Sequence, residues 1–195
     1  MSSISDPAAT LRFDSGQLIQ EAGDAGSAWR VANGVVRFDA INPGGEPTYA
    51  GLAMEGDIVG ADTLLFGRCS FRTTALTPCE LVPWPGAAQA ERDSLLNALM
   101  LGERRAARVV ALRSGQAVER IRRLLGVFLP QATPAVFSTE LPPLRDMAEI
   151  TALTIETVSR TLSGLRRQGV IEPESERRGN GRKSCRIMTD LLGTT

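Results

Sequence analysis

Three polar side chains with hydrogen-bonding chemistry are closely spaced in one short segment of the sequence. The stretch "TIETVSRTLSGLRRQGVIE", residues 154–172, contains Glu156, Ser159 and Arg160. Positions i, i+3 and i+4 lie on one side of a helix, so these side chains would share an exposed face. Arginine can donate two hydrogen bonds to guanine, glutamate can accept from the amino group of cytosine or adenine, and serine can do either. The spacing therefore predicts a surface able to read the edges of bases.

The apolar residues of the same segment predict the helix that would present these side chains. Val158, Leu162 and Leu165 recur at i, i+4 and i+7 and would form one buried stripe. Thr154 precedes the stripe and is a good N-cap, whereas Gly169 follows it and can end a helix. We therefore expect a helix between these two residues, with its polar side turned to solvent.

A second, shorter helix is predicted immediately upstream. The stretch "LRDMAEIT", residues 144–151, places Met147 and Ile150 on one side, and Ala152 and Leu153 leave room only for a tight turn. Two short helices joined by such a turn form a helix-turn-helix, whose second helix enters the major groove of DNA. The alternative is an ordinary pair of packed helices whose charged residues are merely solvated.

A basic hairpin is predicted after the second helix. The stretch "VIEPESERRGNGRKSCRIM", residues 170–188, has a Gly-Asn-Gly tip with cations on both sides. Beside a helix-turn-helix, such a hairpin is a wing suited to phosphates. The candidate phosphate contacts are Arg178, Arg182 and Lys183 in the wing, Thr154 and Thr157 at the start of the second helix, and Arg145 on the first helix.

The charge distribution agrees with a nucleic-acid contact in the C-terminal part. The formal net charge of the chain is zero, but residues 1–114 carry 10 basic and 13 acidic groups, and residues 115–195 carry 12 and 9. A polyanion should therefore meet the C-terminal residues.

Residues 10–86 have the pattern of a small antiparallel β structure. Short apolar runs are separated by turn sequences that favour positive φ angles, such as Asn33-Gly34 and Pro43-Gly44-Gly45. We expect an α+β fold with an N-terminal antiparallel β-barrel or jelly roll over residues 1–87, a long helix over 88–114 and a winged helix-turn-helix over 115–195. Ser114 is a candidate N-cap of the next helix, and the segment from Pro130 to Pro143 is expected to be a loop.

The long helix over residues 88–114 carries a seam of apolar and small residues with alternating spacings of four and three. This spacing is typical of a coiled coil, and the small residues would let two backbones approach closely. The sequence therefore favours a dimer interface, with a helix packed on its own barrel as the alternative. The seam consists of Leu95, Leu99, Gly102, Ala106 and Val109.

The absence of histidine excludes several classes of function. With no histidine in the chain, catalytic triads that use this residue and His-ligated zinc, iron or haem sites cannot form. The three cysteines, Cys69, Cys79 and Cys185, lack the spacing of a metal motif. We therefore expect no enzyme, no metal and no cofactor. With no signal sequence and no long apolar run, a cytoplasmic protein without membrane contact is expected.

The stretch "DMAEITALTIETVSRTLSGLRRQGVI" resembles the helix-turn-helix of the CRP/FNR superfamily of bacterial transcription regulators. The order of barrel, long helix and winged helix-turn-helix extends this resemblance over nearly the whole chain. In members with the pattern Glu-x-x-Ser-Arg, these residues read a half-site like TTGAT, and here they correspond to Glu156, Ser159 and Arg160. Ile155 stands where the cyclic-AMP-responsive members have another arginine.

The resemblance also implies partners. The chain would form a homodimer on palindromic double-stranded DNA, with the two reading helices roughly 34 Å apart in successive major grooves. RNA polymerase is a further partner that the resemblance implies.

The resemblance places a candidate effector pocket in "GDIVGADTLLFGRCSFRTTALTPCELVPWP". Family members bind cyclic nucleotide there through Gly-Glu and Arg-Ser pairs. Gly60 and Ser70 match, but Ala61 replaces the glutamate and Cys69 stands where the phosphate arginine belongs. The candidate pocket residues are Gly60, Ala61, Arg68, Ser70 and Arg72, where either arginine could substitute only after a loop shift. A phosphate site without its cation should bind poorly, so cyclic AMP is not expected.

The identity of an effector therefore stays open. An unknown small molecule, a thiol-based redox response and the absence of any effector are the alternatives. Cys185 has basic neighbours in the wing that would favour a reactive thiolate, although an inert cysteine is the simpler interpretation. The rival to a DNA-binding regulator is a ligand-binding, redox-sensing or interaction module whose helix-turn-helix serves only packing.

Overall fold

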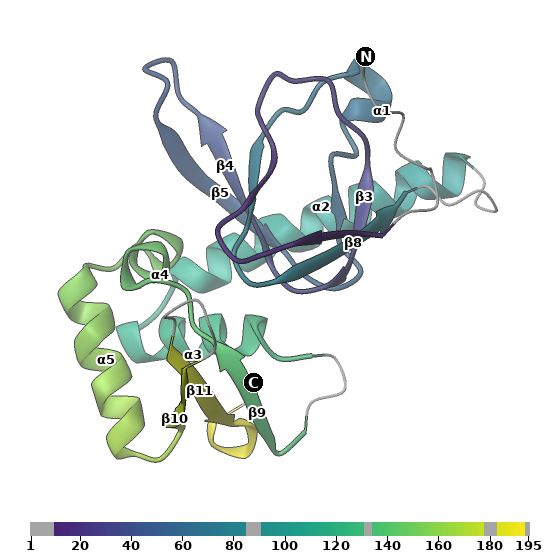
Figure 1. Cartoon of the computed structure of the whole chain (residues 1–195). Helices are drawn as coiled ribbons and strands as arrows, with labels where there is room; N and C mark the ends of the chain where they lie inside the picture. The colour runs from purple at the N-terminus through teal and green to yellow at the C-terminus, as the bar shows by residue number, and fades with distance from the viewer. Residues whose placement is uncertain (1–9, 85–90, 131–133, 178–182, 194–195) are drawn as a thin grey trace. The chain divides into compact units, whose positions relative to one another are not determined.

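A computed structural model describes residues 10–84, 91–130, 134–177 and 183–193. The chain divides into two compact units, Met1–Arg108 and Val109–Thr195, called unit 1 and unit 2 below (Figure 1). Among the helices of the described ranges, none has the length and apolarity that would be required to cross a membrane.

Unit 1 contains two four-stranded antiparallel sheets. One sheet has the order β1 (Leu11–Phe13), β8 (Cys79–Pro83), β3 (Trp29–Asn33) and β6 (Ile58–Val59). The other has the order β2 (Leu18–Gln20), β7 (Arg72–Ala75), β4 (Val36–Ile41) and β5 (Pro47–Ala53). This pairing matches the jelly-roll alternative of the sequence prediction; within the described residues the two sheets do not close into one barrel.

The core of unit 1 is formed by apolar side chains of both sheets. The buried cluster consists of Val31, Val36, Phe38, Ala53, Val59, Ala75, Cys79 and Leu81. A glycine makes one close approach possible at its edge: Gly34 has a φ of 88°, and a Cβ atom there would collide with the carbonyl oxygen of Pro78. The short helix α1 (Thr63–Phe66) lies between β6 and β7 in the chain.

The long helix α2 (Glu91–Arg113) belongs to unit 1 up to Arg108, and one side of this part packs on the rest of the unit. Ala98 and Leu101 pack against a buried cluster that contains Trp84. Arg108 donates one hydrogen bond to Asp57 Oδ2 and another to the carbonyl oxygen of Leu52, each 2.9 Å long. The guanidinium carbon of Arg105 lies 4.3 Å from the ring centre of Phe38, and burial lowers the pKa of this arginine.

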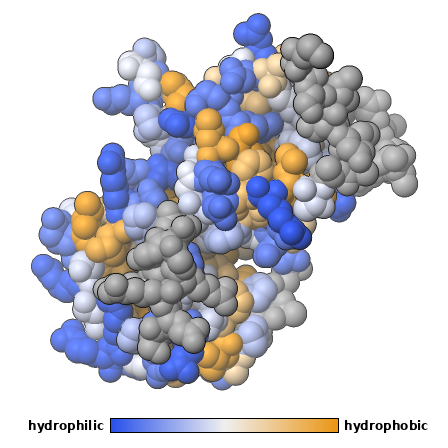
Figure 2. Space-filling model, in the orientation of Figure 1, coloured by the Kyte–Doolittle hydropathy of each residue, from blue (hydrophilic) through white to orange (hydrophobic). Residues whose placement is uncertain are grey.

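The other side of α2 exposes large apolar residues. Leu99 is 64% exposed, and Leu96, Met100 and Val110 are each more than half exposed. On the face drawn in Figure 2, hydrophilic residues surround smaller groups of hydrophobic ones. Removing apolar surface from water is favourable by about 25 cal/mol per Å², so an exposed row of apolar side chains is a candidate contact surface.

Unit 2 combines three helices with a three-stranded sheet. Helices α3 (Ala117–Val127), α4 (Leu144–Thr151) and α5 (Ile155–Arg167) pack on one another, and the sheet has the order β10 (Ile171–Arg177), β11 (Lys183–Met188) and β9 (Val136–Glu140). A short 3₁₀ helix, η1 (Thr189–Leu191), follows β11. The fully buried side chains include Ile121, Leu124, Leu125, Met147, Ile150, Val158, Leu165, Ile171 and Ile187.

Two details differ from the sequence prediction. The expected loop between Pro130 and Pro143 contains β9, whose Val136–Glu140 pair with β11. Ser114 is not the N-cap of α3, because its hydroxyl donates to the carbonyl oxygen of Val110. Gln116 takes the N-cap position in a capping box with Glu119, which satisfies two backbone amides at once.

Truncation of the buried stripe of α5 should destabilise unit 2. Leu162 is buried in the described structure, so Leu162→Ala should lower the free energy of unfolding by about 2–5 kcal/mol. Urea denaturation followed by circular dichroism measures this loss. Ser163→Ala is the matched control, since Ser163 is exposed on the same helix and its change should be nearly neutral. Equal losses for both variants would contradict the packing described above.

Candidate DNA-binding site

The turn between α4 and α5 is held by backbone and side-chain hydrogen bonds. Helix α4 ends at Ala152, whose φ of 52° is the one positive value of a non-glycine residue in the described ranges. The amide of Leu153 donates to the carbonyl oxygen of Ala148, which closes this end of the helix. Thr154 caps α5, because its hydroxyl oxygen accepts from the amide of Thr157 at 3.2 Å.

Helix α5 separates the predicted buried and exposed residues as expected from its sequence. Val158, Leu162 and Leu165 are almost fully buried. Glu156, Ser159 and Arg160 are all exposed on the described surface, and Ile155 is exposed beside them. The structure therefore leaves the three polar side chains at one end of α5 without a packing role.

Local hydrogen bonds favour the ionised form of Glu156. Its pKa lies below the ordinary value, chiefly because its own backbone amide and the side chain of Thr154 hydrogen bond to the carboxylate; the positive charge of Arg160 adds a smaller effect. An ionised carboxylate only accepts hydrogen bonds, which is the form needed to meet an amino group of a base.

The structure describes some of the residues that are predicted to contact phosphates, and others lie outside the described ranges. Thr154 and Thr157 lie at the first turn of α5, where backbone amides favour an anion. Arg145 is highly exposed on α4 and forms an ion pair with Glu149 at 3.1 Å. Arg178 and Arg182 lie outside the described residues, and Lys183 is the first residue of β11.

The two strands of the predicted wing, β10 and β11, lie on either side of residues 178–182, which are outside the described ranges. Strands β10 and β11 pair antiparallel, with Ile171 opposite Ile187 and Glu172 opposite Arg186. Arg186 forms an ion pair with Glu172 at 2.9 Å, so this wing cation already has an acidic partner.

Several other arginines of unit 2 bind carbonyl groups at helix ends, a role that the sequence did not reveal. Arg113 donates to the carbonyl oxygens of Glu149 and Ile150, and Arg120 donates to that of Thr151. These carbonyls belong to the last residues of α4, where the regular hydrogen bonds of the helix end. Arg123 makes the same kind of contact with Ala111 and Ser114, near the end of α2. Part of the positive charge counted in the sequence therefore serves the fold itself.

The candidate effector segment of unit 1 is closely packed. Gly60 has a φ of 72°, and a Cβ atom there would lie 2.6 Å from the carbonyl oxygen of Ser27. The amide of Ser70 donates to the carboxylate of Asp62, and Arg72 lies 3.5 Å from the carboxylate of Glu21. The segment is therefore held by its own side chains.

Cys69, which stands at the position of the phosphate arginine, is buried. Its sulfur packs against Gly26 so closely that a Cβ atom added to this glycine would lie only 2.6 Å from the sulfur. The sulfur therefore occupies the space beside Gly26. Ala61 is half-buried, and Arg68 lies in an isolated β-bridge with Ala25. Arg72 is thus paired with Glu21, and the side chain of Arg68 is exposed.

The three cysteines share a chemical environment that disfavours the thiolate. Burial raises the pKa of Cys79 to about 11 and that of Cys185 to about 11, and burial with nearby carboxylates raises that of Cys69. Of the two interpretations of Cys185, the inert cysteine agrees better with this burial, because the positive charge of Arg166 offsets it only in part. No group of metal-binding side chains is found in the residues that the structure describes.

Comparisons with known proteins agree with this architecture. Residues 119–180 match the model of the Crp-like helix-turn-helix domain. The nitrogen fixation regulation protein FixK of Bradyrhizobium diazoefficiens is 32% identical over 175 residues, which cover 83% of this chain and 73% of the relative. A probable transcriptional activator of Rhizobium leguminosarum is 28% identical over 174 residues, covering 83% and 72%.

Solved structures show the same fold. TTHB099, a CRP-family transcriptional regulator from Thermus thermophilus, superimposes with a TM-score of 0.65 at 25% identity, over 93% of this chain and 94% of its own. FixK2 from Bradyrhizobium japonicum gives a TM-score of 0.66 at 21% identity, over 95% of each chain. The chain belongs to the CRP/FNR family of transcriptional regulators. It is a DNA-binding regulator of transcription, and this family is not one of enzymes.

The cap of α5 should contribute measurably to stability. Thr154→Ala removes the acceptor for the amide of Thr157 and should lower the free energy of unfolding by about 1 kcal/mol. Thr154→Ser keeps a hydroxyl and is the matched control, with a much smaller loss expected. Urea denaturation compares the two variants, and a loss that is as large for serine as for alanine would contradict the capping role.

The thiols should react slowly in the folded protein. With a pKa of about 11, Cys79 and Cys185 are ionised to less than about one part in a thousand at pH 7.5. Iodoacetamide labelling followed by mass spectrometry should therefore be slow at this pH and accelerate as the pH approaches 11. The urea-unfolded chain is the control and should label rapidly; equal rates in both states would contradict the burial of the thiols.

Proposed function

We propose that the chain binds a palindromic, TTGAT-like DNA site as a homodimer, and that Glu156, Ser159 and Arg160 read the bases. The observation that carries this proposal is the exposure of all three side chains at the N-terminal end of α5, above a buried apolar stripe. Arg160 would bind guanine with two hydrogen bonds, the ionised Glu156 would accept from an amino group, and Ser159 would complete the half-site.

Phosphate contacts would fix the position of α5 in the groove. The hydroxyls of Thr154 and Thr157 lie at the first turn of α5, where the positive end of the helix dipole favours a phosphate oxygen. Arg145 would leave its exposed ion pair with Glu149 at little cost, since such pairs contribute about 0–1 kcal/mol. The remaining proposed contacts are the wing residues Arg178, Arg182 and Lys183.

The dimer would form along α2, in keeping with a division into a sensor-like domain over residues 1–87, a dimerisation helix over 88–114 and a DNA-binding domain over 115–195. Support comes from the exposed side of this helix, where Leu99 and Ala106 of the predicted seam are both exposed. A Cβ atom added at Gly102 would meet nothing within 4 Å, which leaves room for a second backbone. Leu95 and Val109 complete the predicted seam.

Regulation by cyclic AMP is not part of this proposal. Ala61 offers no carboxylate for a ribose, and buried Cys69 offers no cation for a cyclic phosphate. The recognition motif and the altered cassette together favour a regulator whose signal is not cyclic AMP. RNA polymerase is proposed as a partner because a transcriptional regulator acts on promoter DNA.

Base reading and phosphate binding should separate in a DNA titration. Arg160→Ala should abolish the preference for a TTGAT-like palindrome over random DNA, because the bidentate contact accounts for about 1–3 kcal/mol of discrimination. Lys183→Ala should weaken binding to both DNAs alike and reduce the slope of affinity against salt by about one. Fluorescence anisotropy at two salt concentrations measures both effects, and added cyclic AMP should change neither.

The same titration can contradict the proposal. An equal loss on both DNAs for Arg160→Ala would remove this residue from base reading. Unselective wild-type binding with no salt dependence would instead support an interaction module.

The dimer should depend on the exposed apolar side of α2. Leu99→Glu would place a charge at a proposed apolar contact, so the variant should sediment as a monomer at concentrations where the wild type is dimeric. Leu18→Glu on β2 is the matched control, since Leu18 is also exposed and apolar but lies outside α2. A monomeric wild type, or dissociation caused equally by both changes, would overturn the proposed interface.

A further inference from the structure

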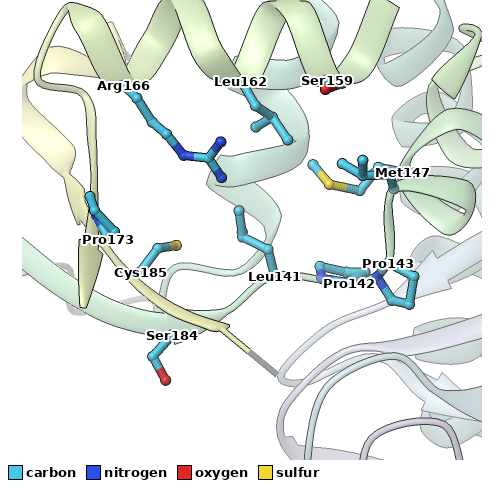
Figure 3. A pocket seen from close by; sticks show the side chains of 11 residues that line it. Leu141, Pro142, Pro143, Met147, Ser159, Leu162, Arg166, Pro173, Ser184 and Cys185 are labelled. Carbon is cyan, nitrogen blue, oxygen red and sulfur yellow. The ribbon is translucent and has the colours of Figure 1, made fainter. Parts of the chain in front are cut away.

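Unit 2 contains a cavity between α5, α4 and the wing strands. Its volume is about 480 Å³, which is within the range of sites for small molecules. Leu162 of α5, Met147 of α4 and Leu141, which precedes α4, contribute apolar walls. In Figure 3, Leu141 points across the cavity toward α5, and Cys185 faces it from β11.

One cation stands out among these apolar walls. Arg166 extends from α5 toward Cys185 and Leu141 (Figure 3). Among the described residues, Arg166 forms no ion pair, and no carboxylate lines the cavity. Arg166 is exposed, so its guanidinium can meet a carboxylate at the mouth of the cavity, and the apolar walls suit a hydrocarbon group.

The other polar groups of the cavity leave this positive charge in place. The thiol of Cys185 is neutral at physiological pH, since burial raises its pKa to about 11. Ser159, which also lines the cavity, has an uncharged hydroxyl group. The lining of the cavity therefore combines one positive charge with largely apolar side chains, and the nearest carboxylate that acts on Cys185, that of Glu174, lies outside this lining.

We propose that this cavity binds a small organic monocarboxylate with an apolar body, whose carboxylate pairs with Arg166 and whose hydrocarbon part lies against Leu141, Met147 and Leu162. A single guanidinium matches the single charge and the two oxygens of a carboxylate. A phosphate monoester would bring a second charge near neutral pH for which the cavity has no second cation.

Occupancy of the cavity would act on DNA binding through its position beside the reading helix. Ser159 belongs both to the wall of the cavity and to the proposed base-reading group, so this part of the inference rests on the proposed function. A bound carboxylate would neutralise the positive charge of Arg166 on α5, and the loss of this charge would weaken the attraction of the helix to phosphates. The ligand would thus lower DNA affinity.

Calorimetric titration of the full chain without DNA tests the cavity itself. Octanoate is the probe, octanol is the neutral probe of the same length, and acetate is the anion without an apolar body. Octanoate should bind at least tenfold more tightly than either. Arg166→Gln should remove this advantage over octanol, whereas Arg167→Gln, the matched control at the next exposed arginine of α5, should keep it.

A second variant tests the apolar walls independently of charge. Leu141→Trp should fill the cavity and abolish binding of octanoate, with circular dichroism to confirm that the variant is folded. Octanoate binding that is absent in the wild type, or that survives both Arg166→Gln and Leu141→Trp, overturns the cavity as the site. Specific DNA binding in that case would leave the proposed function intact.

The effect on DNA is measured separately by anisotropy with a palindromic duplex. Saturating octanoate should weaken DNA binding by the wild type and leave a folded Leu141→Trp variant unaffected. Octanoate that binds the cavity without any change in DNA affinity would overturn the coupling between the two sites.

Discussion

The presentation of α5 depends on arginines that bind the carbonyl groups at the end of α4. A helix leaves its last carbonyls without partners, and these groups carry the negative end of the helix dipole. Arg113 of α2 and Arg120 of α3 donate to three successive carbonyls there, at Glu149, Ile150 and Thr151. Hydrogen bonds to a charged donor are stronger than neutral ones, so the tight turn before α5 is anchored from two helices at once.

The sequence predicted those parts of unit 2 that depend on neighbouring residues. The bounds of α4, the cap at Thr154 and the buried stripe of α5 all follow from residues within a few positions of one another, and the structure agrees with each. The end of α5 near Gly169 was predicted in the same way, and Gly169 has a φ of 72°, a conformation that glycine adopts most easily. Exposure of the polar triplet on α5 was therefore predictable, whereas its part in reading DNA stays a proposal.

Features that depend on distant residues could not be predicted in the same way. Strand β9 forms because Val136–Glu140 meet β11, whose residues follow only after both helices of the helix-turn-helix. The raised pKa of Cys185 likewise results from burial, and burial cannot be predicted from the basic residues next to it in the sequence. The carbonyl-binding arginines contact backbone groups that are distant in the sequence, so only the fold shows these contacts. The same holds for the cavity, whose walls come from separate elements.

The left-handed conformation of Ala152 restricts how the turn of the helix-turn-helix can vary. A β-branched residue would clash with its own backbone at a φ of 52°, so such substitutions should be rejected whatever DNA sequence is read. Glycine would remove that clash but would also give the unfolded chain more freedom, and the two effects oppose each other. Alanine has the smallest side chain that still limits this freedom. The turn can therefore stay constant while the exposed positions of α5 change, which separates the evolution of binding specificity from that of folding.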